Sequence, residues 1–231
     1  MKSQFPALKI LTVLSILLFL TALAMVFFFT PLEETMNYVQ KIFYFHISNA
    51  WVGMLGFMVA AVAGIAYLVS HNRKWDSLEM AAIEISLVFF LIAIMLGSIW
   101  AKPVWNTWWT WDPRLTTAAI VELIYLACML LRQGIDDPDR RARFCAVYTV
   151  IGSLSVPLAF LSIRLFRTIH PVVIGNGGVN GQGSFAMTAP MLATMFFCLF
   201  TFSVIFVTLL WHRVRLENLM VAVEERQMEV F

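Results

Sequence analysis

Two histidines and a dense run of tryptophans are the residues of this chain best suited to hold a flat, apolar ligand with a metal at its centre. His46 and His170 flank the stretch 100–114, which contains five of the eight tryptophans. Imidazole is a common ligand of iron, and haem iron accepts one axial ligand on each face of its ring. Tryptophan supplies the broad aromatic surface against which a porphyrin packs. The sequence therefore predicts a haem site with His46 and His170 as metal ligands.

The tryptophans are spaced so that several indoles can share one surface. Trp105, Trp108 and Trp109 follow an i, i+3, i+4 pattern, which on a short helix places three indoles on one side. With Trp111, they are expected to form the wall of the haem site. The alternative interpretation is simple anchoring, because indoles also gather at membrane interfaces.

Cations for the propionates of a haem are available in the same segments. Arginine is the better partner, because its planar guanidinium makes paired hydrogen bonds to a carboxylate. The candidates are Arg114, Arg164, Arg167 and Lys102. Asp112 belongs to the predicted site as well, although Asp112-Pro113 also fits the start of a helix, with aspartate as N-cap and proline as the first helical residue.

Membrane-spanning helices must position these residues, because the chain of 231 residues is 61% hydrophobic and only 13% charged. Six apolar runs are each near the roughly 20 residues that a helix needs to cross a bilayer. They are 8–29, 47–69, 80–99, 115–131, 144–163 and 187–211, with the tryptophan loop at 100–114. We expect an all-α polytopic membrane protein with six transmembrane helices, folded as a single domain over residues 1–231. The first run starts like a signal peptide but continues to Phe29, which predicts a retained helix.

The distribution of basic residues sets the expected orientation. With the N-terminus in the cytoplasm, eleven of the sixteen lysines and arginines lie in cytoplasmic segments and five in outer segments. Because basic residues concentrate on the cytoplasmic side, both termini are expected there and the tryptophan loop outside. The net charge of +2 gives no reason to expect nucleic-acid binding. The three cysteines form no CxxC pair, which argues against a thiol-exchange or zinc site.

Other features predict local structure. Pro157 falls midway along the fifth apolar run and is expected to kink it. The segment 175–183 has five glycines in nine residues and is expected to be a mobile outer loop. His71 and His212, at cytoplasmic helix ends, are expected to be boundary residues.

Two carboxyl groups fall within apolar runs, where they are costly and often functional. Glu122 lies near the middle of the fourth run, and Glu84 lies closer to the cytoplasmic end of the third. Pairing with a partner subunit, proton transfer and a protonated resting state all remain open. Neither residue predicts a complete proton path.

The segment 105–116, Trp-Asn-Thr-Trp-Trp-Thr-Trp-Asp-Pro-Arg-Leu-Thr, resembles the tryptophan-rich WWD motif of membrane haem-handling proteins. With six expected helices and one outer histidine on each side of the motif, the chain is most similar to the CcmC family, the haem exporter protein C of cytochrome c maturation. The resemblance covers nearly the whole chain. It departs at Asn106, where the family usually has glycine, which adopts positive φ more freely.

The resemblance implies a protein of the bacterial inner membrane that binds haem b as cargo at the periplasmic face. It implies transfer of the haem to a periplasmic chaperone, CcmE, with an ABC transporter pair, CcmA and CcmB, and a small membrane subunit, CcmD, as neighbours. His46 and His170 match the axial ligands of the family. The motif core is matched by Trp105, Trp108, Trp109, Trp111 and Asp112. Candidate contacts for the chaperone are Glu33, Glu34 and Lys41 in the first outer loop.

On this interpretation the chain carries and transfers haem and is not itself an enzyme. One alternative is a cytochrome c haem lyase or synthase subunit of the CcsA or CcmF type, which shares the WWD motif but is typically larger and has additional membrane histidines. A second alternative is a transporter or scaffold subunit whose tryptophans only anchor it. The scaffold alternative predicts that substitutions at His46 and His170 are tolerated.

Overall fold

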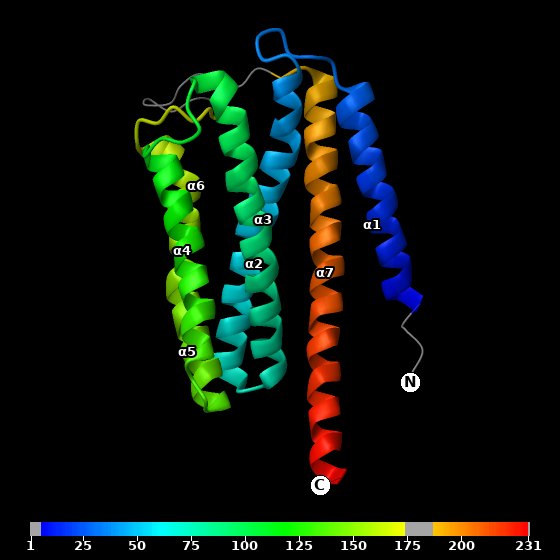
Figure 1. Cartoon of the computed structure of the whole chain (residues 1–231), viewed down its shortest axis with the longest axis vertical. Coiled ribbons are helices and arrows are strands. Elements are labelled where there is room, and N and C mark those ends of the chain that lie inside the picture. The colour runs from blue at the N-terminus through cyan, green and yellow to red at the C-terminus, as the bar shows by residue number, and fades with distance from the viewer. Residues whose placement is uncertain (1–5, 174–186, 231) are drawn as a thin grey trace.

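A computed structural model describes residues 6–173 and 187–230, and nearly all of them are helical (Figure 1). Six helical segments are long and apolar enough to cross a membrane, which confirms the predicted class. The α-helices are α1 (Pro6–Ala24), α2 (Lys41–Ser70), α3 (Arg73–Trp105), α4 (Pro113–Gln133), α5 (Pro138–Gly152), α6 (Ser155–Leu165) and α7 (Ala189–Val230). A π-helical turn, η1 (Met25–Phe29), and a 3-10 turn, η2 (Tyr38–Gln40), lie between α1 and α2. The glycine-rich stretch 175–183 is outside the described residues.

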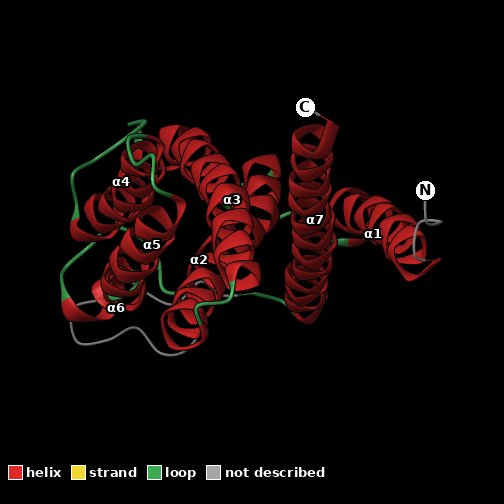
Figure 2. Cartoon of the chain, turned by 90° about the horizontal axis from the view of Figure 1, so that it is seen from below, coloured by secondary structure: helices red, strands yellow, loops and turns green. Residues whose placement is uncertain are grey.

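The antiparallel pair α2 and α3 is the centre of the bundle. Seen from below, α4, α5 and α6 lie on one side of this pair and α7 on the other, with α1 at the outer edge beside α7 (Figure 2). Stacked rings join the central pair to α4, because Phe57 of α2 packs face to face on Tyr125 at 3.8 Å between ring centroids. Phe90 of α3 meets the same Phe57 ring edge-on at 5.9 Å.

Small residues allow α2 and α3 to pack closely. A Cβ atom at Gly53 would lie 2.7 Å from Cβ of Phe90, and one at Gly56 would lie 2.0 Å from Oγ of Ser86. Lipid tails are as apolar as the side chains, so helices in a membrane associate largely through such close packing. The pair is therefore the frame from which the site is built.

Helix α2 begins at Lys41, six residues before the apolar run that predicted it. The Lys41 side chain is buried, and its Nζ donates to the carbonyl of Val26 at 2.6 Å. A lysine there satisfies carbonyl groups at the end of the first span, where the helix dipole favours a cation. Because the side chain is buried, the expected chaperone contact at Lys41 is wrong.

The fifth span is interrupted where a proline was expected to distort it. Helix α5 ends at Gly152, α6 begins at Ser155, and Pro157 lies in the first turn of α6. Proline has no N–H to donate to the carbonyl four residues earlier, at Ser153. At this interruption the Ser153 hydroxyl donates a hydrogen bond to the backbone carbonyl of Val150 at 2.7 Å.

Helix α3 runs through Trp105 and ends at Asn106, whose φ of 58° and ψ of 20° are left-handed. Asparagine is the residue after glycine that most readily adopts this conformation, so Asn106 supports the backbone that a motif glycine would provide. Nζ of Lys102 donates to the Asn106 carbonyl at 3.2 Å. Residues 106–112 are not helical, so the expectation of a short helix carrying three indoles is wrong.

The intramembrane acids have different surroundings. Glu84 pairs with Arg213 of α7, with oxygen-to-nitrogen distances of 2.5 and 3.0 Å. Within the described part of the chain, one buried oxygen of Glu122 has no hydrogen-bond partner. The same is true of both oxygens of Glu79, a fully buried acid of α3. The predicted run began at Met80, one residue too late to include Glu79.

Candidate functional site

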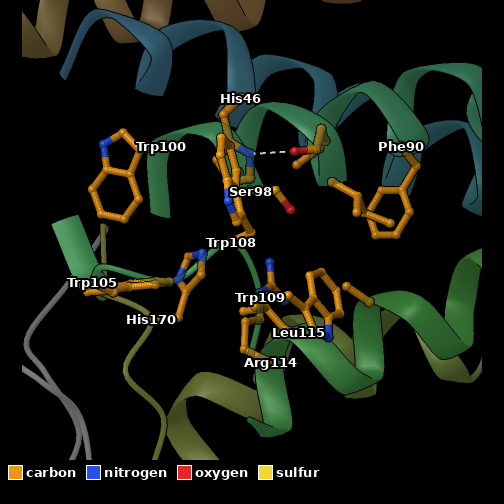
Figure 3. A pocket seen from close by; sticks show the side chains of 15 residues that line it. His46, Phe90, Ser98, Trp100, Trp105, Trp108, Trp109, Arg114, Leu115 and His170 are labelled. Carbon is orange, nitrogen blue, oxygen red and sulfur yellow. Dashed lines mark hydrogen bonds between the residues drawn. The ribbon is translucent and has the colours of Figure 1, made fainter. Parts of the chain in front are cut away.

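The structure brings His46 and His170 together from distant parts of the sequence. His46 lies in the second turn of α2, and His170 lies in the segment after α6. Their ring centroids are 6.3 Å apart and the ring planes are inclined by 43°. Both imidazoles line one cavity (Figure 3).

Backbone contacts fix which nitrogen of each imidazole is available. Nδ1 of His46 is 2.8 Å from the carbonyl oxygen of Ala93, and Nδ1 of His170 is 3.1 Å from that of Pro171. A carbonyl only accepts hydrogen bonds, so each Nδ1 carries a proton and each neutral ring keeps its lone pair on Nε2. Burial, reinforced by the charge of Arg114 and by His46, lowers the pKa of His170 to about 3. His170 is therefore in the neutral form that binds a metal.

Gly97 of α3 makes room for the His46 ring, a role that the sequence analysis did not identify. A Cβ atom at Gly97 would lie 2.9 Å from Cε1 and 3.1 Å from Nδ1 of His46. Ala93, which accepts the hydrogen bond from His46, lies one turn earlier on the same helix. Small residues four apart on an apolar run mark a helix-packing surface. That spacing was the available signal, but it does not indicate which side chain packs there.

Indoles form much of the cavity wall, as Figure 3 shows. Trp105 meets the His170 ring edge-on at 6.4 Å, and Trp100 meets Trp105 at 5.2 Å. The tryptophans that line the cavity are Trp100, Trp105, Trp108 and Trp109. Trp111 lies outside the lining, with 76% of its surface exposed, and packs edge-on against Trp109. Trp100 lines the cavity although it was not predicted to, whereas Trp111 was predicted to line it and does not.

The Asp112 carboxylate joins the tryptophan loop to the histidine segment. One oxygen accepts from the backbone N–H of Leu115 at 2.9 Å and caps α4, which confirms the predicted N-cap. The other accepts from the Thr168 hydroxyl and from the backbone N–H of Ile169, the latter at 3.1 Å. Asp112 thus holds the backbone immediately before His170 against the start of α4.

The predicted cations differ in their positions. Arg114 lines the cavity and donates to the Ala159 carbonyl of α6, so its charge lies beside both imidazoles. Arg164 is exposed and lines a second cavity next to the same histidines. Arg167 is exposed and lines neither cavity. Lys102 donates a hydrogen bond to the carbonyl of Asn106 and lines neither cavity.

The second and larger cavity adjoins the first at the histidine pair and lies among α2, α6 and α7. Residues that line both cavities are His46, Ala50, Trp100, Arg114 and His170. The two imidazoles and the Arg114 guanidinium therefore stand where the cavities meet.

The fold and this site define a multi-pass membrane protein with a paired-histidine, tryptophan-walled pocket toward one end of its helical bundle. The family model described as heme exporter protein C matches residues 2–229, and the chain belongs to this family. It is similar to heme exporter protein C of Bradyrhizobium diazoefficiens, with 36% identity over 69% of this chain and 62% of that protein. For the Escherichia coli protein the identity is 30%, over 87% of this chain and 78% of the relative. The match thus spans about three fifths of the Bradyrhizobium protein.

Proposed function

We propose that this chain binds haem b as cargo, with the iron between His46 and His170. The observation that carries the proposal is the spacing of the two rings. A metal-bound imidazole nitrogen lies about 2 Å from the metal, and the ring centroid lies roughly 1 Å further away. Two imidazoles on opposite faces of one iron are therefore about 6 Å apart between centroids. The separation in the structure is 6.3 Å, and both Nε2 atoms are available.

The surrounding residues suit the rest of such a ligand. Four indoles offer apolar surface to a porphyrin, and Arg114 places a cation beside the iron position. Arg164, in the wall of the larger cavity, and Asp112, which acts on the position of His170, stay part of the proposed site. Trp111 and Arg167 line neither cavity and are proposed only as further contacts of the bound haem.

The proposed setting is the bacterial inner membrane, with both termini in the cytoplasm and the tryptophan loop facing the periplasm. There the chain transfers haem to the chaperone CcmE, beside CcmA, CcmB and CcmD, and catalyses no reaction itself. The relatives' name, heme exporter protein C, supports haem as the cargo. Trp108 and Trp111 are exposed in the tryptophan loop and offer apolar surface to an arriving chaperone.

The lyase and scaffold alternatives gain no support from the histidines. All four histidines of the chain are described, and only His46 and His170 line the two cavities. His71 ends α2 in a left-handed conformation, and Nε2 of His212 is 2.9 Å from the Thr12 hydroxyl. His71 is the boundary residue that was expected, whereas His212 lies inside α7, which continues to Val230, so the expected boundary role of His212 is wrong. Neither histidine provides a second haem ligand pair.

The test is the absorption spectrum of the protein purified from haem-replete cells. We expect a six-coordinate, low-spin haem that becomes five-coordinate or is lost in His46→Ala and in His170→Ala. His71→Asn is the matched control, because asparagine accepts the left-handed conformation at a histidine remote from both cavities. A wild-type protein that stays colourless after haem titration would refute the proposal and favour the scaffold alternative.

A further inference from the structure

The larger cavity extends from the histidine pair to the surface of the bundle that faces lipid. Helix α2 forms its floor, and α6 and α7 stand on either side of α2 (Figure 2). Three aromatic side chains line it and are more than half exposed, namely Phe160 of α6 and Phe196 and Phe200 of α7. Both helices are parts of segments long and apolar enough to cross a membrane, so we infer that these exposed rings face lipid. The cavity therefore opens sideways between α6 and α7.

The lining is apolar for most of its extent, and its polar groups are few and specific. Nε1 of Trp51 on α2 donates to the Ser203 hydroxyl on α7 at 3.0 Å, which ties the floor to one wall. Arg164 lines the wall at the last turn of α6, and Arg114 lies where the two cavities meet. An amphiphile with a broad apolar ring and acidic groups on one edge matches this distribution, since the ring fills apolar space while the acids reach arginine.

We propose that haem reaches the histidine pair laterally, out of the lipid, by passing between α6 and α7 into this cavity. This inference rests on the proposed function and specifies the route of its ligand. Haem that has dissolved in the bilayer stays in apolar surroundings along the path, and its iron meets His46 and His170 where the cavities join. The smaller cavity then receives the part of the ring that passes beyond the histidines, against the indoles.

The experiment obstructs the opening without altering the site. Phe160→Cys is labelled with a bulky maleimide, reconstituted into vesicles, and mixed with vesicles that carry haem in their membrane. Leu158→Cys is the matched control, because Leu158 lies on the same helix, is 58% exposed against 52% for Phe160, and does not line the cavity. The native cysteines Cys128, Cys145 and Cys198 are buried, and wild type treated with the reagent monitors them.

We expect labelled Phe160→Cys to acquire the low-spin spectrum at least about tenfold more slowly than unlabelled Phe160→Cys, a change that reports on the barrier to entry. Labelled Leu158→Cys should load at the unlabelled rate. If Phe160→Cys does not fold, Phe200→Cys places the label on the opposite side of the opening and carries the same expectation.

Equal loading rates for the labelled opening and control variants would overturn the lateral route while leaving haem binding intact. Failure of the proposed function looks different, because then the unlabelled wild type acquires no low-spin spectrum from either vesicles or added haem.

Discussion

At the scale of single residues, one carboxylate has two duties in this site. Asp112 caps α4 with one oxygen and accepts hydrogen bonds from Thr168 and Ile169 with the other. The first duty stabilises a helix, whereas the second fixes the backbone just before His170, the residue proposed as a metal ligand. Outer-shell partners of this kind set ligand orientation in metal sites generally.

The two duties of Asp112 can be separated by substitution. Asp112→Asn retains an oxygen that can accept the hydrogen bond of the helix cap. It loses the negative charge and the second oxygen, which accepts from the Thr168 hydroxyl and the Ile169 N–H. We expect it to lower the free energy of unfolding by only about 1 kcal/mol while raising the five-coordinate fraction of bound haem. Asp112→Ala should show the same spectral change and a larger loss, about 2–3 kcal/mol. Absorption spectra and thermal unfolding of the purified variants measure these effects.

The chain contains a matched control for Asp112. Asp137 caps α5 by accepting from the Arg140 N–H at 2.7 Å, and Pro138 follows it as Pro113 follows Asp112. Asp137→Ala should therefore cost about 1 kcal/mol of stability through the lost cap and leave the haem spectrum unchanged. If Asp112→Ala behaves like Asp137→Ala in both measurements, Asp112 is only a cap.

At the scale of helices, the site depends on how closely α3 approaches α2. The His46 ring occupies space that exists because Gly97 has no side chain, and its Nδ1 bonds to Ala93 one turn away. The His46 ring on α2 is thus oriented by α3, through the Ala93 carbonyl and the space beside Gly97. The direction in which Nε2 of His46 points is therefore set by helix packing and a backbone carbonyl, and not by a flexible side chain.

Gly97→Ala tests this packing directly. Alanine has the higher intrinsic helix propensity, by about 1 kcal/mol, so an effect on the helix alone would stabilise the protein. We expect instead that the added methyl displaces the His46 ring and weakens haem binding at least about tenfold, because the new contact of 2.9 Å is closer than packing allows. Haem titration measures the affinity.

Gly134→Ala controls for a generic effect of removing a glycine. A Cβ atom at Gly134 would lie 3.6 Å from the carbonyl oxygen of Leu131, which is an ordinary contact, and the φ of Gly134 is −85°. Haem affinity should be unchanged in Gly134→Ala. Unchanged affinity in Gly97→Ala as well would show that His46 can relax without cost.

Sequence patterns predicted the six spans but misplaced several of their ends, for a physical reason. Apolar runs report which residues lie in lipid, whereas helices continue beyond it, as α2 does to Lys41 and α3 to Trp105. Motif chemistry placed His46, His170 and Asp112 in one neighbourhood. Gly97 was not predicted, because its role depends on which residue of a distant helix faces it.

At the scale of the whole molecule, α1 is attached differently from the other helices. It lies at the edge of the bundle beside α7, and much of its surface is exposed (Figure 1). Paired polar groups join the two spans: Thr12 with His212, Ser15 with Thr208 at 2.8 Å, and Thr30 with Thr194 at 2.8 Å. Both members of the Ser15–Thr208 pair are buried. Hydrogen bonds between helices are a recognised source of association in lipid, where lipid tails compete equally for apolar contacts.

A double-mutant cycle on Ser15 and Thr208 measures how firmly this pair holds α1. Ser15→Ala and Thr208→Val each remove one hydroxyl, and their coupling in the free energy of unfolding should be about 0.6 kcal/mol and at most roughly 1.7 kcal/mol. Detergent-induced unfolding of the four proteins supplies the values. Haem spectra should stay those of wild type, because neither residue lines the two cavities. A coupling near zero would mean that the two hydroxyls find equally good hydrogen-bond partners when the helices separate. Apolar packing alone would then hold α1 against α7.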